Sequence, residues 1–227
     1  MRMNMYSRTA AITYGVIACA LLVPTGAVYS ASEVSVTVGD DKGTAVEGAV
    51  VIAEPLQGPP RPRSGQMALM DQRNLRFVPD VLVVQTGTAV TFPNSDQVRH
   101  HVYSFSIAKK FELSLYAGKP SAPVIFDHPG LVTLGCNIHD NMLGYVWVTD
   151  SPWYGRTDRE GRIVLRDLPT GEYNVRVWHA LSNATDSQVE QRLSVKDGQA
   201  GALSFRFKRP LRPGVRTYGQ EKSWADY

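Results

Sequence analysis

Short runs in which hydrophobic and polar residues alternate recur along most of the chain. Val34, Val36 and Val38 alternate with polar residues, and the same period returns over residues 111–116 and 132–136. A period of two is that of a half-buried β-strand, because successive side chains of a strand point to opposite faces. Turn residues separate these runs every few positions, and no window has a convincing helical period. The pattern therefore predicts an all-β protein of the sandwich or barrel class.

The strand-like runs fall into three stretches. Residues 32–62 contain two runs and end in a proline-rich break, and prolines of that kind do not sit inside a sheet. Residues 63–150 hold a long series of short runs, and residues 151–208 return to the style of the first stretch. Residues 209–227 are rich in proline, glycine and charge, which predicts a loosely held tail.

Two separated segments together resemble the transthyretin-like, or carboxypeptidase-regulatory, β-sandwich. The first is V-x-V-x-V…G-x-x-V-x-G-A-V-V-I at residues 34–52, and the second runs from Thr157 through L-P-T-G-E-Y-N-V at residues 168–175. In that family the first motif directly precedes the second, whereas here residues 63–150 lie between them. Two strands cannot bury a core alone, and extra length in an exposed loop costs little closure entropy. We therefore expect residues 63–150 to form a domain inserted in, or flanked by, one such sandwich. The alternative is three separate domains in series.

Residues 1–31 have the features of a secretory signal. Arg2 and Arg8 precede an uncharged apolar run over residues 10–23, and small residues follow up to Ala31. The apolar run is short for a membrane span, and the apolar sequence that continues past Cys19 argues against a lipoprotein anchor. We expect an exported, periplasmic protein that is not membrane-spanning after signal cleavage.

Charge and cysteine content narrow the possible partners. The 227-residue chain has a formal charge of +3, but two of its arginines lie in the signal, so the exported form is nearly neutral. A nearly neutral chain gives no electrostatic argument for binding nucleic acid or an anionic membrane. Export also leaves Cys136 as the only cysteine, which cannot form an internal disulfide. A lone thiol in an oxidising compartment is a liability unless it is buried, catalytic or bound to metal.

Cys136 belongs to a C-x-x-H-x-x-M motif that also contains His139 and Met142, with strand-like sequence on both sides. Upstream, the adjacent histidines at 100 and 101 follow Asn-Ser-Asp at 94–96. A thiolate, two imidazoles and a weak thioether are the donors of a type 1 copper site. Each residue alone is more often structural, but their joint occurrence points to metal. Zinc is the chief rival, although its structural sites rarely use a thioether.

The longer string F-x-P…V-x-V-x-x-G-T-x-V-x-F-P-N-S-D…H-H-V…G-C-x-x-H-x-x-M, over residues 77–142, resembles the plastocyanin-like cupredoxins. Its ligand loop looks like that of amicyanin, and the whole string is similar to exported proteins labelled methylamine utilisation protein. The resemblance implies a Greek-key β-sandwich with one type 1 copper ion per chain. The implied ligands are Cys136, His139, Met142 and one of the two adjacent histidines.

The two adjacent histidines are not equivalent. In the resembled family the ligand is often followed by asparagine, which favours His100 as the ligand and puts His101 in the place of the asparagine. The alternation of faces favours His101 instead, because His101 lies on the more apolar face of its strand-like run. Either histidine can therefore be the ligand. We expect the non-ligating histidine, Asn94 and Asp96 to surround the ligands and tune the ion.

The predicted function is transport rather than catalysis. Four protein ligands leave no open position for a substrate, and no Ser-His-Asp set or paired carboxylates stand out. We expect a carrier of single electrons between periplasmic partners such as a c-type cytochrome or a dehydrogenase. The alternatives are a copper storage or delivery protein, and an envelope-binding module whose metal is structural. We interpret Trp147, Trp153, Tyr154 and Trp178 as core or interdomain packing.

Overall fold

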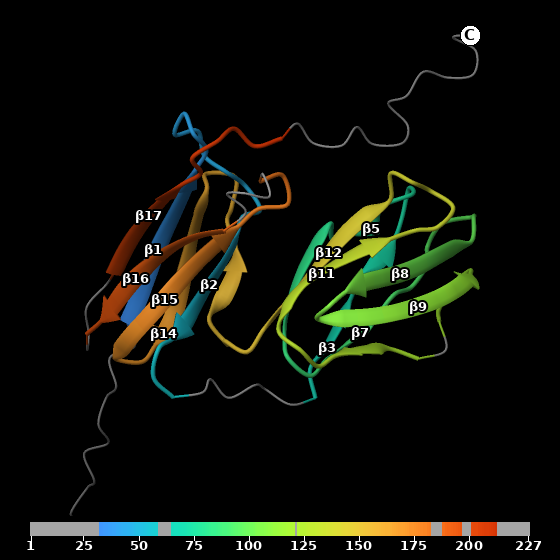
Figure 1. The fold of residues 1–227 in the computed structure, drawn as a ribbon, viewed down its shortest axis with the longest axis horizontal. Helices are drawn as coiled ribbons and strands as arrows, with labels where there is room; N and C mark the ends of the chain where they lie inside the picture. The colour runs from blue at the N-terminus through green and yellow to red at the C-terminus, as the bar shows by residue number, and fades with distance from the viewer. Residues whose placement is uncertain (1–31, 59–64, 121, 183–187, 197–200, 213–227) are drawn as a thin grey trace, which may run out of the picture.

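Two β-sandwiches lie side by side in the computed structural model (Figure 1). The structure describes residues 32–58, 65–120, 122–182, 188–196 and 201–212, so the predicted signal and most of the predicted tail lie outside the described residues. All elements in these ranges are strands, which confirms the predicted all-β class. The same ranges contain no helix long and apolar enough to cross a bilayer.

The first sandwich consists of two sheets whose inward side chains form one core. Three strands make the first sheet, in the order β14 (Arg162–Leu168), β1 (Ser32–Gly39) and β17 (Gly201–Arg206). Four make the second, in the order β13 (Tyr154–Arg156), β2 (Val50–Pro55), β15 (Gly171–Trp178) and β16 (Gln188–Val195). Strand β1 pairs antiparallel with β14 and parallel with β17. Its alternating valines are buried against residues such as Val51, Val175 and Phe205, as the period of two predicts.

The second sandwich has a larger and a smaller sheet. The larger has the order β6 (Val81–Gln85), β12 (Leu143–Thr149), β11 (Gly130–Gly135), β8 (His100–Ser106) and β9 (Lys109–Tyr116). The smaller has the order β10 (Val124–Phe126), β7 (Thr88–Thr91) and β3 (Met67–Leu69), beside the hairpin of β4 (Asp71–Gln72) and β5 (Phe77–Val78). Side chains from both sheets, including Val90, Phe126, Val132 and Val146, fill the core between them.

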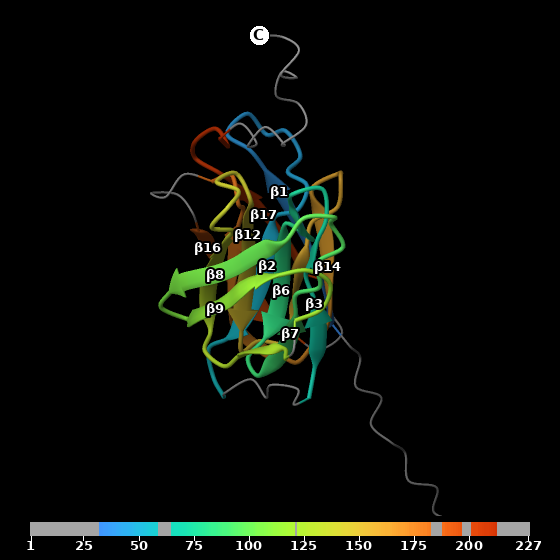
Figure 2. The same cartoon turned by 90° about the vertical axis from the view of Figure 1, so that its right-hand side faces the viewer.

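The connectivity places the second sandwich between two halves of the first. After β2 the chain crosses to the second sandwich and returns at β13, where Tyr154 pairs with Ile52 of β2. In the described part of the chain, β1 and β2 pair with strands that follow residue 153, while strands of residues 67–149 pair among themselves. Figure 2 shows β8 and β9 in front of the strands of the first sandwich. This topology suits an insertion, and the boundaries at 63 and 150 stay a prediction.

An apolar cluster joins the two sandwiches. Val50, Ile52 and Trp178 come from the first sandwich, Val81 and Trp147 come from the second, and all five side chains are buried. The Trp178 ring centroid lies 5.3 Å from that of Trp147, at an interplanar angle of 47°. The structure thus confirms the packing role predicted for these two tryptophans.

The strand-like run at residues 75–77 forms a strand only at Phe77, where β5 begins. Asn74 and Leu75 instead form a turn between β4 and β5, with φ values of 54° and 56°. The residues that flank this pair exchange two backbone hydrogen bonds of 2.9 and 3.2 Å. The type I′ hairpin turn, which matches the twist of its strands, needs positive φ at both central positions, and this normally selects glycine or asparagine. Leu75 carries no such signal, so the pattern reads it as part of the strand.

Candidate metal centre

Strand alternation directs the Cys136 side chain into the second sandwich. Val132, Leu134 and Cys136 point inward in succession, and the cysteine is 4% exposed. Strands β11 and β12 pair as far as Gly135 and Leu143, so the loop that carries the motif begins directly after the last pair. The sheet therefore fixes both ends of this loop.

The loop brings His139 back toward the cysteine. The Met142 N–H donates a 2.9 Å hydrogen bond to the His139 carbonyl, which closes a tight turn. The Nδ1 atom of His139 then lies 3.6 Å from the Cys136 sulfur. Met142 is buried in the same core cluster as Cys136, whereas His139 is only partly buried. The loop therefore runs from a buried thiol through a partly exposed imidazole to a buried thioether.

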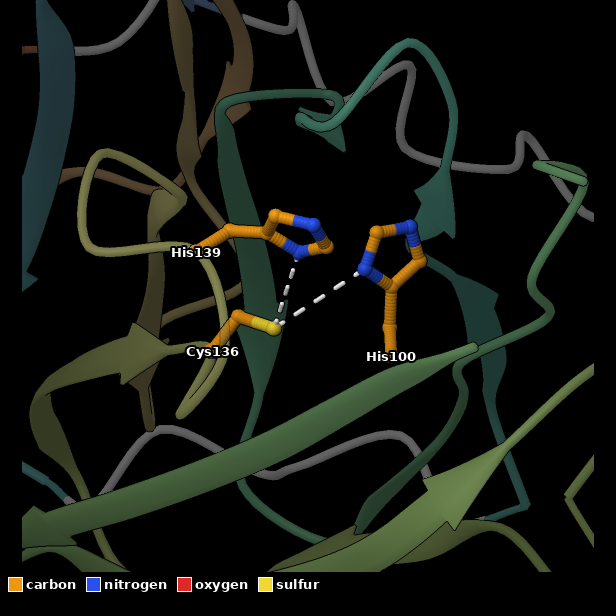
Figure 3. A group of neighbouring side chains, drawn as sticks. All are labelled: His100, Cys136 and His139. Atoms are coloured by element: carbon orange, nitrogen blue, oxygen red, sulfur yellow. Dashed lines mark hydrogen bonds between the residues drawn. The ribbon is translucent and has the colours of Figure 1, made fainter. Parts of the chain in front are cut away.

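His100 approaches the same sulfur from another strand. It begins β8, its side chain is fully buried on the face of Val102 and Ser104, and its Nδ1 atom lies 3.8 Å from the Cys136 sulfur. Figure 3 shows both histidines turning Nδ1 toward this sulfur. The His101 side chain lies on the opposite face of β8 and forms a 2.9 Å contact from Nε2 to Glu112. The structure therefore brings His100, and not its neighbour, to the cysteine.

The three donors are spaced as a metal ion requires. The ligand atoms of His100, Cys136 and His139 all lie within 4.8 Å of one another. A trigonal or tetrahedral ion, with bonds of about 2.3 Å to sulfur and 2.0 Å to nitrogen, separates sulfur from nitrogen by about 3.5–3.7 Å. The two observed separations of 3.6 and 3.8 Å are close to this range. A thiol has a single proton to offer two ring nitrogens, whereas one ion binds all three atoms. The residues present therefore fit a soft metal.

Asp96 binds the other side of the His100 ring. Its Oδ2 lies 2.8 Å from His100 Nε2. The same carboxylate accepts hydrogen bonds from the backbone N–H groups of Asn74 at 2.6 Å and Leu75 at 2.9 Å. The sequence indicated Asp96 but gave no sign of the two turn residues, because they lie more than twenty positions upstream.

Asn94 shapes the loop that presents Asp96. Its side-chain amide donates to the carbonyls of Val98 at 2.8 Å and Tyr116 at 3.0 Å, and its carbonyl oxygen accepts the Asp96 N–H at 3.0 Å. Asn94 therefore holds the loop against β9 rather than touching the three donor side chains. It acts on the candidate site through the position of Asp96.

The electrostatics of the pocket favour a neutral imidazole at His139. Burial lowers the pKa of His139, repulsion from His100 lowers it further, and attraction to Asp96 opposes these effects more weakly. Partial burial acts to raise the pKa of Asp96, but hydrogen bonds from Leu75, His100 and Asn74 together outweigh it and leave the pKa lowered. Metals bind neutral imidazole, so His139 is held in the form that a metal needs.

Comparisons with known proteins find similarity only among solved structures. Neither the protein-family models nor the curated proteins give a match. A copper-containing nitrite reductase from Thermus scotoductus is 22% identical with a TM-score of 0.35, over 42% of this chain and 25% of that one. A reduced amicyanin variant is 21% identical with a TM-score of 0.32, over 43% of this chain and 98% of that one. The purple cupredoxin of Nitrosopumilus maritimus is 22% identical with a TM-score of 0.29, over 37% and 99%. At these scores the donor geometry alone carries the assignment of the candidate site.

Proposed function

We propose that the protein is a type 1 copper protein that carries single electrons. The observation behind this is the convergence of two Nδ1 atoms on the buried sulfur of Cys136, with Met142 buried in the same cluster. Copper bound by such donors alternates between two oxidation states and so takes up or gives up one electron. The thiolate, two imidazoles and a thioether suit copper better than zinc.

The protein would hold the ligands of the ion in fixed positions and leave one of them, His139, partly exposed to solvent. Two strands of one sheet and the loop between its paired ends hold the ligands, so their positions change little when the charge of the ion changes. Ile138, which directly precedes His139 in the loop, is 51% exposed, and Leu143, which directly follows Met142, is 43% exposed. This surface offers a partner an apolar contact beside the imidazole, where electrons would enter and leave.

We propose the location and the partner from features of the sequence. The signal-like residues 1–31 support export, and we propose the periplasm as the compartment. A periplasmic redox protein, such as a c-type cytochrome or a dehydrogenase, would supply or accept the electron. Asp140, beside His139 in the loop, favours a basic docking surface on that partner.

An optical and EPR spectrum of the copper-loaded protein tests the proposal. We expect strong absorption near about 600 nm from the thiolate-to-copper transition. A colourless Cu(II) form, or a site that retains zinc and rejects copper, would contradict it. Slow electron exchange combined with rapid copper transfer to an apo-acceptor would show storage or delivery instead.

Replacing Met142 by leucine should keep the colour and raise the reduction potential. A weak axial thioether stabilises Cu(II), so its loss favours Cu(I). Redox titration of the loaded variant measures the shift. Met70→Leu is the matched control, because Met70 is a fully buried methionine in the same core. Equal potentials for the two variants would argue against Met142 as a ligand.

A further inference from the structure

The buried histidine of the candidate site is held from both sides of its ring. Nδ1 of His100 faces the Cys136 sulfur, and Nε2 lies 2.8 Å from an Asp96 oxygen. The His100 side chain is fully buried and that of Asp96 is 12% exposed. A carboxylate acts only as an acceptor, so this contact requires a proton on Nε2, and in the neutral imidazole Nδ1 then keeps its lone pair. Charge-assisted hydrogen bonds of this kind are strong where water is excluded.

The Asp96 carboxylate is itself fixed by a strained turn. Asn74 and Leu75 both have positive φ and both donate their N–H groups to it. Leucine disfavours this conformation, because its Cβ approaches the following carbonyl oxygen. Backbone strain of this kind persists where the surroundings hold it and is frequent at functional sites. Here the turn, which is strained at Leu75, points both N–H donors at the carboxylate that binds the buried histidine.

The same strand offers a natural comparison. His101 also contacts a carboxylate, that of Glu112, at a similar distance of 2.9 Å. Glu112 belongs to β9 and its side chain is 66% exposed, and the His101 side chain that it contacts lies on the face of β8 opposite to His100. Solvent screens such a pair, so it has little influence on the buried donors. The His100–Asp96 and His101–Glu112 pairs are therefore chemically alike, but only the first is buried and lies on the face of β8 that contains the candidate site.

We infer that Asp96 is a positioning residue for the metal: it fixes the Nε2–H tautomer of His100, aims Nδ1 at the ion and lowers the reduction potential. The inference rests on the proposed copper site. A hydrogen-bonded carboxylate makes the imidazole a stronger donor, and its negative charge favours Cu(II) over Cu(I). The strained turn at Asn74 and Leu75 supplies the two N–H groups that keep this carboxylate in place.

The first test needs no metal. Nitrogen-15 NMR of the metal-free wild-type protein should show His100 as the Nε2–H tautomer with a strongly hydrogen-bonded ring proton. The Asp96→Ala variant should lose that bonded proton, while Glu112→Ala should leave it unchanged. A wild-type His100 protonated on Nδ1 alone would overturn the inference. This result is independent of whether copper is the physiological ion.

The second test measures the potential of the copper-loaded protein. Asp96→Asn should change the Cu(II)-to-Cu(I) ratio at a fixed solution potential at least tenfold toward Cu(I), which is 59 mV for one electron. Glu112→Gln removes the same charge and should change the ratio less than about threefold, because its site is exposed. Equal shifts for the two variants would overturn the inference. A wild-type protein without the blue spectrum would overturn the proposed function instead, and leave the NMR result standing.

Discussion

Replacing Cys136 by serine should abolish the absorption of the copper-loaded protein near about 600 nm, because that band arises from the thiolate-to-copper transition. The Cys136 sulfur is the atom on which both Nδ1 atoms converge, and the described residues hold no other cysteine. A hydroxyl is a hard, weakly donating group and does not replace the thiolate. We expect any remaining Cu(II) to give the weak colour and larger EPR splitting of an ordinary copper complex.

Two further variants make this result specific. His100→Ala should also remove the blue band, whereas His101→Ala should keep it, because His101 lies on the opposite face of β8. Circular dichroism should show that all three variants remain β-rich. A blue Cys136→Ser protein, or loss of colour in His101→Ala alone, would contradict the site described above.

Truncation of Trp178 to alanine should lower the free energy of unfolding by about 3–5 kcal/mol, as is typical of a large buried aromatic residue. The ring is 5% exposed and packs on Trp147 and Tyr145 at centroid distances of 5.3 Å. These contacts cross from one sandwich to the other, so we also expect the two sandwiches to unfold less cooperatively. Urea unfolding followed by circular dichroism and by copper absorbance would separate the two transitions.

Phe105→Ala is the control for this measurement. Phe105 is an aromatic residue of β8, in the larger sheet of the second sandwich, and it is 78% exposed. Substitutions at exposed sites usually change stability by about 0.5 kcal/mol or less. Similar effects for Trp178→Ala and Phe105→Ala would mean that the apolar cluster between the sandwiches contributes little.

Local alternation identified most strands, and it also placed Cys136. The period of two puts Val132, Leu134 and Cys136 on one face, and the structure shows that face inside the sandwich. The same rule misleads for the adjacent histidines. His101 shares its face with Tyr103 and Phe105, yet the buried face is that of His100. Apolar character did not identify the inward face of β8, because the residue that begins it on that face, His100, is polar and yet fully buried.

Contacts between distant segments were beyond the reach of the pattern. The two runs in residues 32–62 correspond to β1 and β2, but the pattern did not indicate that these strands belong to different sheets. Parallel pairing of β1 with β17 joins opposite ends of the described chain and leaves no mark in either local sequence. The turn at Asn74 and Leu75 also depends on a distant residue, because its two N–H groups donate to Asp96. The local sequence does not show this contact.

The parallel pairing of β1 with β17 also sets an order of assembly. Val34 pairs with Gly201, so β1 meets this partner only across almost the whole described chain. The strands of residues 67–149 pair among themselves over shorter separations, which cost less loop entropy, so we expect them to assemble first. Once they have assembled, Ile52 and Tyr154 lie side by side, and the long detour between them no longer adds to the entropy of closing the first sandwich. The folded second sandwich would thus bring together the two segments of the chain that form the first sandwich.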